Sequence, residues 1–127
     1  MAATRTRPRG FTLIELLVVM AIIGVLLSIA APRYFNHVEH ARDNALRQSL
    51  AVMRDAIDKF HADTDTWPAS LEVLVERKYL RSIPEDPHTG NRESWSVEAP
   101  TDGASGVYDV HSGAPGNTSE GAPLAEL

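Results

Sequence analysis

The order of apolar and polar positions divides the chain into a basic start, a long apolar run, an amphipathic stretch and a mixed remainder. The apolar run covers residues 11–31, in which Glu15 is the one charged side chain. A helix over these 21 residues is about 31 Å long, which is enough to cross the hydrocarbon core of a bilayer. We therefore predict a transmembrane helix in residues 11–32.

Apolar residues then recur every three or four positions from Arg33 to about Ala62, and charged residues occupy the opposite face. This spacing is typical of an amphipathic helix that covers a core with one face. We expect residues 11–62 to form a single helix of 52 residues, with segment 33–62 packing beneath a small domain. The predicted apolar stripe comprises Val38, Arg42, Leu46, Leu50, Met53, Ile57 and Phe60.

Gly24 and Pro32 interrupt the apolar part of this helix. Pro32 has no N–H to donate to the carbonyl group of Ser28 and its ring crowds that turn, so we predict a kink near residues 28–32. Two interpretations remain open. Transmembrane helices commonly tolerate both residues, or the two residues form a weak turn that stretches or melts when the helix packs among others.

Residues 63–127 show shorter elements. Ser70 is a plausible N-cap for a second helix with an apolar face of Leu71, Leu74, Val75 and Tyr79, and Arg77, Lys78 and Arg81 would complement its C-terminal dipole. Turn-forming residues in segment 83–91 predict an ordered loop. The predicted fold class is α+β, in which the long helix packs against a short helix and a small antiparallel β-sheet.

Two alternating segments predict the strands of that sheet. In residues 94–98 the pattern places Trp95 and Val97 on one face, and in residues 107–111 it places Tyr108 and Val110 inward. A pair of strands this small must pack on a helix to be stable. The tail, residues 112–127, has few apolar side chains, so we expect a loop or partial disorder.

Charge and composition narrow the function. The 127-residue chain has a formal net charge of −5 and no cysteine. Once residues 1–10 and their three arginines are set aside, nine basic residues face 17 acidic ones, which argues against direct binding of nucleic acid. No constellation indicates an enzyme, because His111 and Ser112 are neighbours without an identifiable orienting acid. The pair His37 and His40 is more typical of a solvated helix face than of a metal site.

The arginines before the apolar run predict that the N-terminus stays cytoplasmic. An ordinary signal peptide is the alternative, but Glu15 inside the apolar block and the helical pattern beyond Pro32 argue against it. A carboxylate within an apolar helix costs up to about 3 kcal/mol in lipid. Glu15 therefore needs a cation as its partner.

The segment Arg9-Gly10-Phe11-Thr12-Leu13-Ile14-Glu15 and the apolar residues after it closely resemble the N-terminal signature of type IV pilins and type II secretion pseudopilins. The resemblance implies that residues 1–10 are a leader, that a prepilin peptidase cleaves after Gly10, and that the new amine of Phe11 is methylated. It further implies that Glu15 neutralises the Phe11 amine of a neighbouring subunit. Pro32 falls where these families usually have a kinking proline.

Downstream motifs are similar to those of the major, G-type pseudopilin of type II secretion. They are Trp67-Pro68, the loop Ile83-Pro84-Glu85-Asp86-Pro87, and Val110-His111-Ser112-Gly113, and the missing cysteine also favours this family. The resemblance implies a non-enzymatic subunit of an inner-membrane, single-pass type, with a periplasmic domain in residues 63–127. Its implied partners are further copies in a helical filament, the peptidase, minor pseudopilins, the assembly platform and the membrane.

Two alternatives follow from the same resemblance. The first alternative is that the chain is a type IV pilin or minor pilin that serves adhesion, motility or DNA uptake. Major pseudopilins also often hold calcium through aspartates of the final loop, whereas this chain offers there Glu120 and Glu126, with Asp109 and Ser112 nearby. Calcium takes six to eight oxygen ligands. We therefore expect no cofactor or metal, and keep calcium in the final loop as the alternative.

Overall fold

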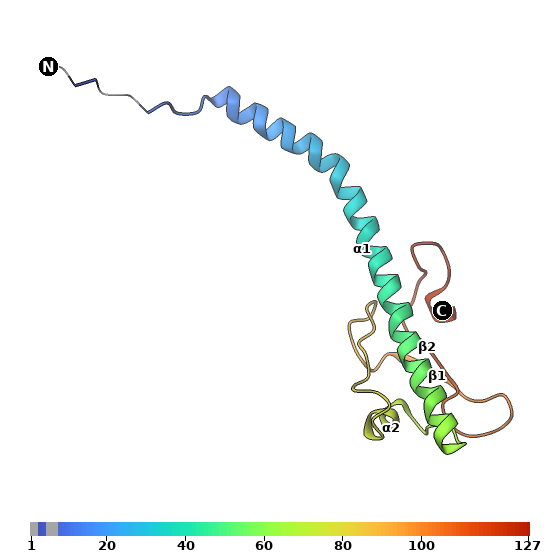
Figure 1. Cartoon of the computed structure of the whole chain (residues 1–127). Helices are drawn as coiled ribbons and strands as arrows, with labels where there is room; N and C mark the ends of the chain where they lie inside the picture. The colour runs from blue at the N-terminus through green and yellow to red at the C-terminus, as the bar shows by residue number, and fades with distance from the viewer. Residues whose placement is uncertain (1–2, 5–7) are drawn as a thin grey trace. The chain divides into compact units, whose positions relative to one another are not determined.

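The computed structural model describes residues 3–4 and 8–127, and the chain divides into two units, residues 1–35 and 36–127, each described by itself. Its elements are the helices α1 (Leu13–Thr64) and α2 (Leu71–Glu76), the antiparallel strands β1 (Trp95–Glu98) and β2 (Asp109–Ser112), and a 3-10 helix, η1 (Leu124–Glu126) (Figure 1). The predicted α+β fold, with one long helix, one short helix and a small antiparallel sheet, is confirmed.

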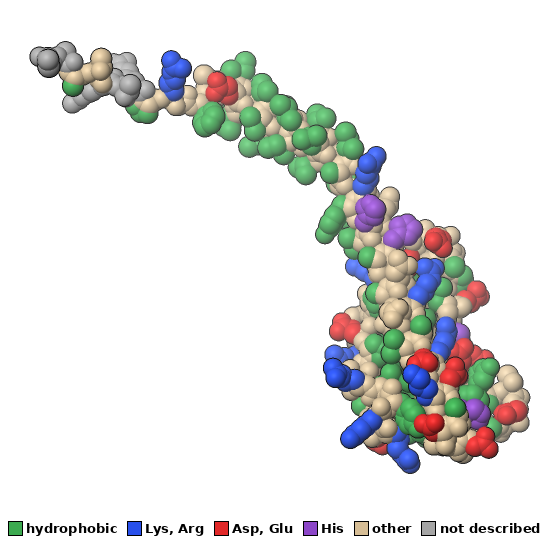
Figure 2. Space-filling model, in the orientation of Figure 1, with side chains coloured by type: hydrophobic (Ala, Val, Ile, Leu, Met, Phe, Trp, Pro, Cys, Tyr) green, Lys and Arg blue, Asp and Glu red, His purple; other side chains and the backbone are tan. Residues whose placement is uncertain are grey.

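Helix α1 has the predicted length of 52 residues, but it begins and ends two positions later than expected. It continues through Gly24 and Pro32, so the kink near residues 28–32 stays a prediction. Every residue from 8 to 35 is exposed, and apolar side chains cover the helix in this unit (Figure 2). The apolar segment is long enough to cross a membrane. An exposed apolar surface of this extent is typical of a site that contacts a membrane or another protein.

The core of the second unit forms on one face of α1. Leu46, Leu50, Met53 and Ile57 are fully buried there, and they pack with the buried side chains of Leu71, Leu74, Val107, Val110 and Leu124. The predicted stripe is thus confirmed from Leu46 onward, but it is wrong at its start. Arg42 is exposed and its neighbour Asp43 is buried, because the final loop supplies hydrogen bonds to the Asp43 carboxylate.

Helix α2 is shorter than predicted and ends at Glu76. Ser70 is its N-cap, although the Ser70 side chain makes no capping hydrogen bond. Lys78 adopts a left-handed backbone with φ 66°, and the N–H groups of residues 79 and 80 both donate to the Leu74 carbonyl group. This C-terminal turn leaves the basic residues beyond the helix. That Arg77, Lys78 and Arg81 complement the helix dipole stays a prediction, although none of the three lies within the last turn of α2.

The two strands pair in a single register, with Trp95 opposite Ser112 and Glu98 opposite Asp109. Strand β2 contributes Val110 and Ser112 to the core, whereas β1 stays at the surface and half-buries only Trp95. The prediction that Tyr108 packs inward is wrong, since Tyr108 is 48% exposed, and Val97, which was predicted to share a face with Trp95, is 52% exposed. A sheet of two strands covers only a narrow face, so its outer strand is left uncovered.

We expected either a loop or partial disorder for the segment after β2. The structure shows a loop. Its Ala114, Thr118 and Leu124 side chains are buried. Asn117 and Pro123 form an isolated antiparallel bridge that closes the loop. Few apolar side chains are needed because polar groups on α1 hold the segment.

Arg54 on α1 is one of these groups. Its Nε donates to Asp109 Oδ1 at 2.7 Å, and its Nη2 donates to the carbonyl oxygens of Val110 at 2.9 Å and Leu127 at 2.7 Å. The guanidinium thereby joins α1, β2 and the end of the final loop. Charge-assisted hydrogen bonds of this kind stabilise more than neutral ones.

We expect Arg54→Ala to lower the free energy of unfolding by about 2–3 kcal/mol, because three buried or half-buried acceptors lose their donor. Arg47→Ala is the matched control on the same helix: its Nη2 lies 3.7 Å from an exposed Glu120 carboxylate, and such pairs are worth under about 1 kcal/mol. Both tryptophans of the chain lie in the second unit. Urea denaturation of detergent-solubilised protein followed by tryptophan fluorescence measures the difference, and equal losses in both variants would contradict it.

Candidate functional site

The start of α1 is fixed by a reciprocal pair of hydrogen bonds between Thr12 and Glu15. The Glu15 N–H donates to Thr12 Oγ1 at 3.2 Å, and the Thr12 N–H donates to Glu15 Oε2 at 3.3 Å. This is a capping box, which satisfies two backbone donors at the first turn of a helix. Our sequence interpretation missed it, although the spacing Thr-x-x-Glu is its signal.

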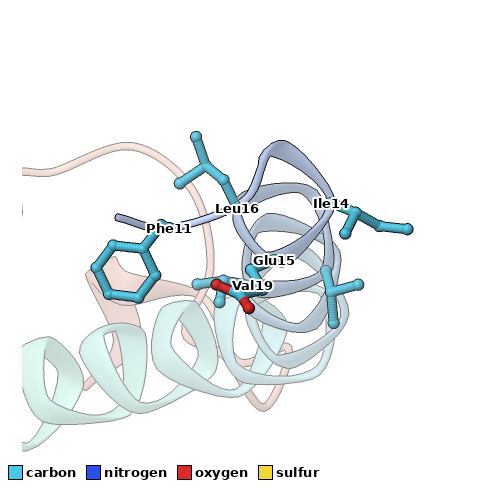
Figure 3. Close-up of a pocket in the computed structure, with 6 residues that line it drawn as sticks. Phe11, Ile14, Glu15, Leu16 and Val19 are labelled. Atoms are coloured by element: carbon cyan, nitrogen blue, oxygen red, sulfur yellow. The ribbon is translucent and has the colours of Figure 1, made fainter. Parts of the chain in front are cut away.

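The structure brings together three of the predicted site residues, Gly10, Phe11 and Glu15, at this exposed end. Phe11 is 93% exposed. A shallow apolar groove surrounds the Glu15 carboxylate (Figure 3), lined by Phe11, Ile14, Glu15, Leu16, Val18 and Val19. Gly24 and Pro32 lie further along α1 and do not join the site. Among the predicted leader residues, Arg5 and Arg7 lie outside the described residues.

Gly10 is not required by the packing of the chain. A Cβ atom built on it would meet nothing within 4 Å, and Gly10 is not among the glycines with a positive φ. The described fold therefore does not require glycine at this position, and processing at the Gly10-Phe11 bond stays a prediction.

The Glu15 carboxylate is positioned to take a second partner. It stabilises the positive end of its own helix, but the contact to the Thr12 N–H is long and the side chain is exposed. The Thr12 N–H is a neutral hydrogen-bond donor and does not neutralise the charge of a carboxylate. In an apolar environment, the negative charge of Glu15 therefore still requires a cation.

Comparison with known proteins decides the family. A family model described as the prokaryotic N-terminal methylation motif matches residues 5–31. The type II secretion system core protein G of Escherichia coli K12 is 30% identical over 123 residues, which cover 86% of this chain and 83% of that protein. The chain belongs to the type II secretion system core protein G family. The Pseudomonas aeruginosa PAO1 member is also 30% identical, over 85% of this chain and 84% of its own length.

A fimbrial protein also matches part of this chain. The fimbrial protein EcpC of Eikenella corrodens is 34% identical over 80 residues, or 59% of this chain, and the match spans about half (52%) of EcpC. No solved structure matches significantly. The resemblance drawn from the sequence motifs is thus confirmed at the level of the family.

Two of those motifs contact each other in this chain. Ser112 Oγ donates to Asp86 Oδ2 at 2.5 Å, and the other Asp86 oxygen accepts the N–H of His88 at 2.8 Å. Both Asp86 and Ser112 are buried. The Ile-Pro-x-Asp-Pro loop is therefore fastened to the Ser-Gly segment after the last strand. Because Ser112 faces Asp86 rather than His111, the pair His111 and Ser112 does not form a nucleophile with its base.

The sheet register creates a further cluster that our sequence interpretation missed. His111 Nε2 lies 3.1 Å from Glu98 Oε2 and 3.4 Å from Asp109 Oδ2, and ligand atoms of the three residues fall within 4.8 Å of one another. Two carboxylates and an imidazole suit zinc better than calcium. Asp109 and His111 already have protein partners outside the cluster, however, since Arg54 contacts Asp109 and the Leu127 carbonyl oxygen lies 3.0 Å from His111 Nδ1.

The pKa of Asp109 reflects these contacts. Burial raises the pKa of this carboxyl, but the Val110 N–H, the Arg54 guanidinium and His111 together outweigh burial and leave the pKa below its ordinary value. Asp109 is therefore ionised at neutral pH. Arg54 on α1 offsets part of the negative charge of this cluster through its ion pair with Asp109.

Proposed function

We propose that this chain is a structural subunit of a type II secretion pseudopilus, which polymerises through its N-terminal helix and supports protein export. The observation that carries the proposal is the exposed apolar helix with one acid at its start, directly behind a Gly-Phe junction. Such a helix is suited to two environments, the lipid bilayer before assembly and a bundle of identical helices afterwards. Nothing in this role requires catalysis, and we infer a non-enzymatic protein.

The assembly mechanism follows from charge. Cleavage after Gly10 gives Phe11 a free amine, methylated in this proposal, one helical turn from Glu15. Each charge alone is costly in a low dielectric, whereas the pair compensates both. If Glu15 pairs with the Phe11 amine of the neighbouring subunit, a subunit out of register leaves two charges unpaired. The weak contact to the Thr12 N–H is readily exchanged for this stronger partner.

We infer that the protein is anchored in the inner membrane by a single pass of α1. Arg9 before the helix, with Arg5 and Arg7 outside the described residues, favours a cytoplasmic N-terminus. The unit formed by residues 36–127 then lies in the periplasm. Its partners in this proposal are the prepilin peptidase, minor pseudopilins and the inner-membrane assembly platform, and no direct contact with nucleic acid is needed.

The fimbrial relative supports a second candidate function, that of a type IV pilin or minor pilin for adhesion, motility or DNA uptake. Deleting the gene separates the two. Loss of protein export with normal surface motility and DNA uptake supports the pseudopilin, and the reverse result supports the pilin.

Gly10→Ala is expected to leave the precursor uncleaved, because the peptidase is proposed to read the Gly-Phe junction. Mass spectrometry of membrane fractions measures this: the wild type should begin at a methylated Phe11, and the variant should retain residues 1–10. Gly24→Ala is the matched control, since a Cβ there also meets nothing within 4 Å, and it should be processed normally. A Gly10→Ala protein that begins at Phe11 would contradict the proposal.

A further inference from the structure

The calcium site that the resemblance implies does not fit the final loop of this chain. The loop carries two carboxylates, Glu120 and Glu126, and both residues are exposed. The Glu120 carboxylate lies 3.7 Å from the Arg47 guanidinium, so an arginine rather than a metal ion is the positive charge beside it. Calcium takes six to eight oxygen ligands, usually from several carboxylates held by one loop. The loop must therefore be held by other means.

Asp43 on α1 provides a different attachment. Its carboxylate is nearly completely buried, with 2% exposure. Asp43 Oδ2 accepts the Ser119 N–H at 2.8 Å and the Ser119 hydroxyl at 2.7 Å, and Asp43 Oδ1 lies 3.1 Å from His88 Nε2. Ser119 Oγ also lies 3.0 Å from His40 Nδ1. Both carboxylate oxygens thus have protein partners from two separate loops.

The final loop is shaped to present Ser119 to this carboxylate. The Thr118 N–H donates to the Ala122 carbonyl at 2.7 Å, and Thr118 Oγ1 accepts the Ala122 N–H at 3.1 Å. These bonds close a tight turn around residues 119–121. Thr118 is buried, so the turn is fixed to the domain on the side where Asp43 lies.

We propose that Asp43, His88 and Ser119, here called the Asp43 clasp, fasten the final loop to α1 in the place of a calcium ion. In this proposal the Asp43 carboxylate on α1 holds the final loop in position, which in a calcium-binding relative would be done by a calcium ion bound to acidic residues of that loop. The buried carboxylate is stabilised by the two hydrogen bonds from Ser119, and His88 Nε2 lies 3.1 Å from its other oxygen. The domain then keeps its final loop ordered whether or not calcium is present.

Several ionisable groups surround Asp43: Glu39, His40 and Arg42 on α1, His88 on the 83–91 loop, and Glu120 beyond Ser119. Burial raises the pKa of Asp43, but the Ser119 N–H, the Ser119 hydroxyl and His88 outweigh burial and lower the net pKa. A lowered pKa in the folded state means that the ionised carboxylate stabilises the fold. This stabilisation is present above the ordinary pKa of an aspartate and is lost as the pH falls below about 4.

The test uses the full chain in detergent, with tryptophan fluorescence reporting the Tm of the second unit. Asp43→Asn should lower the Tm by about 5–15 °C at neutral pH, and this difference should shrink below about pH 4. Asp55→Asn is the matched control on the same helix, because Asp55 is exposed and forms a surface ion pair with Lys59, and it should shift the Tm by under about 2 °C. Calcium at about 5 mM, above the Kd of weak extracellular sites, should leave the wild-type Tm unchanged.

A second readout is local. A glutamate-specific protease should cut after Glu120 faster in Asp43→Asn than in the wild type or Asp55→Asn, at temperatures well below the Tm. Ser119→Ala, which removes one hydroxyl group, serves the same purpose if Asp43→Asn does not fold. An increase of several degrees in the wild-type Tm with calcium, lost in Asp43→Asn, would make Asp43 a calcium ligand and overturn the proposal. Unchanged Tm and unchanged cleavage in both variants would overturn it as well.

Discussion

Glu15→Gln is expected to lower the amount of subunit recovered in filaments by at least about tenfold, while cleavage after Gly10 and membrane insertion stay normal. Glutamine keeps the shape of the side chain and its carbonyl oxygen can still accept the Thr12 N–H, so the helix should begin where it does now. What it removes is the negative charge. The Phe11 amine of the neighbour is then left unpaired at an apolar interface, and a cost of 1.4 kcal/mol per contact already corresponds to a factor of about ten.

Sheared filaments and membrane fractions, compared by immunoblotting, measure this effect. Thr12→Val is the informative control, because it removes the hydroxyl that accepts the Glu15 N–H but leaves the charge of Glu15 intact. Loss of such a cap costs about 1 kcal/mol of helix stability. If Thr12→Val lost as much filament as Glu15→Gln, the role of Glu15 would be helix capping alone. Normal assembly of Glu15→Gln would rule out charge pairing.

Features that depend on neighbouring positions along the chain were predictable from the sequence. The length of the apolar run makes α1 long enough to cross a membrane, and the three- and four-residue spacing from Leu46 to Phe60 determines its buried face. The Gly10-Phe11 junction and Glu15 lie within six residues. The capping box was equally local, and the spacing of Thr12 and Glu15 was sufficient to find it.

Asp43 could not be found in this way. A helical pattern assigns an acid to the solvent face, and the partner that makes burial tolerable, Ser119, is 76 residues away. The apolar period therefore selected Arg42 for the stripe, although Asp43 is the buried residue. A polar residue in a core is specified by its partners rather than by its spacing.

The cluster at the sheet depends on register. Glu98, Asp109 and His111 meet because Glu98 pairs with Asp109 and His111 follows two residues later on the same face. Alternation fixes which residues share a face but not which residues lie opposite across the strands. Strands of four residues offer little pattern from which to choose a register. Tyr108 was placed inward by alternation, but it precedes the first residue of β2, Asp109.

The Ser-Gly segment shows why a motif can be recognised before its reason is known. Ser112 fastens β2 to Asp86. Gly113 follows at a point where a Cβ would overlap the Ser94 carbonyl oxygen and lie 3.1 Å from the carbonyl carbon of that residue. Ser94 directly precedes β1, whose first residue, Trp95, pairs with Ser112. Only a residue without a side chain lets the backbones approach this closely.

Gly113→Ala is therefore expected to destabilise the second unit by more than about 3 kcal/mol, which is at the upper end for a single substitution. The methyl group meets backbone, which cannot rotate away, so Ser94 must move and the Trp95 and Ser112 pairing is lost with it. We expect the Tm by tryptophan fluorescence to fall by more than about 12 °C. In cells, faster degradation of the subunit should follow, with less filament even though Phe11 is processed normally.

Gly116→Ala separates this steric effect from backbone strain. Gly116 has a φ of 99°, but a Cβ there meets nothing within 4 Å. The cost should be the roughly 1–3 kcal/mol typical of a strained backbone, which is smaller than the loss expected at Gly113. Equal losses at the two positions would mean that loop conformation, and not the close approach to Ser94, explains the glycine after Ser112. A larger loss of stability in Gly113→Ala would show that the close approach of Gly113 to Ser94 is what requires a glycine after Ser112.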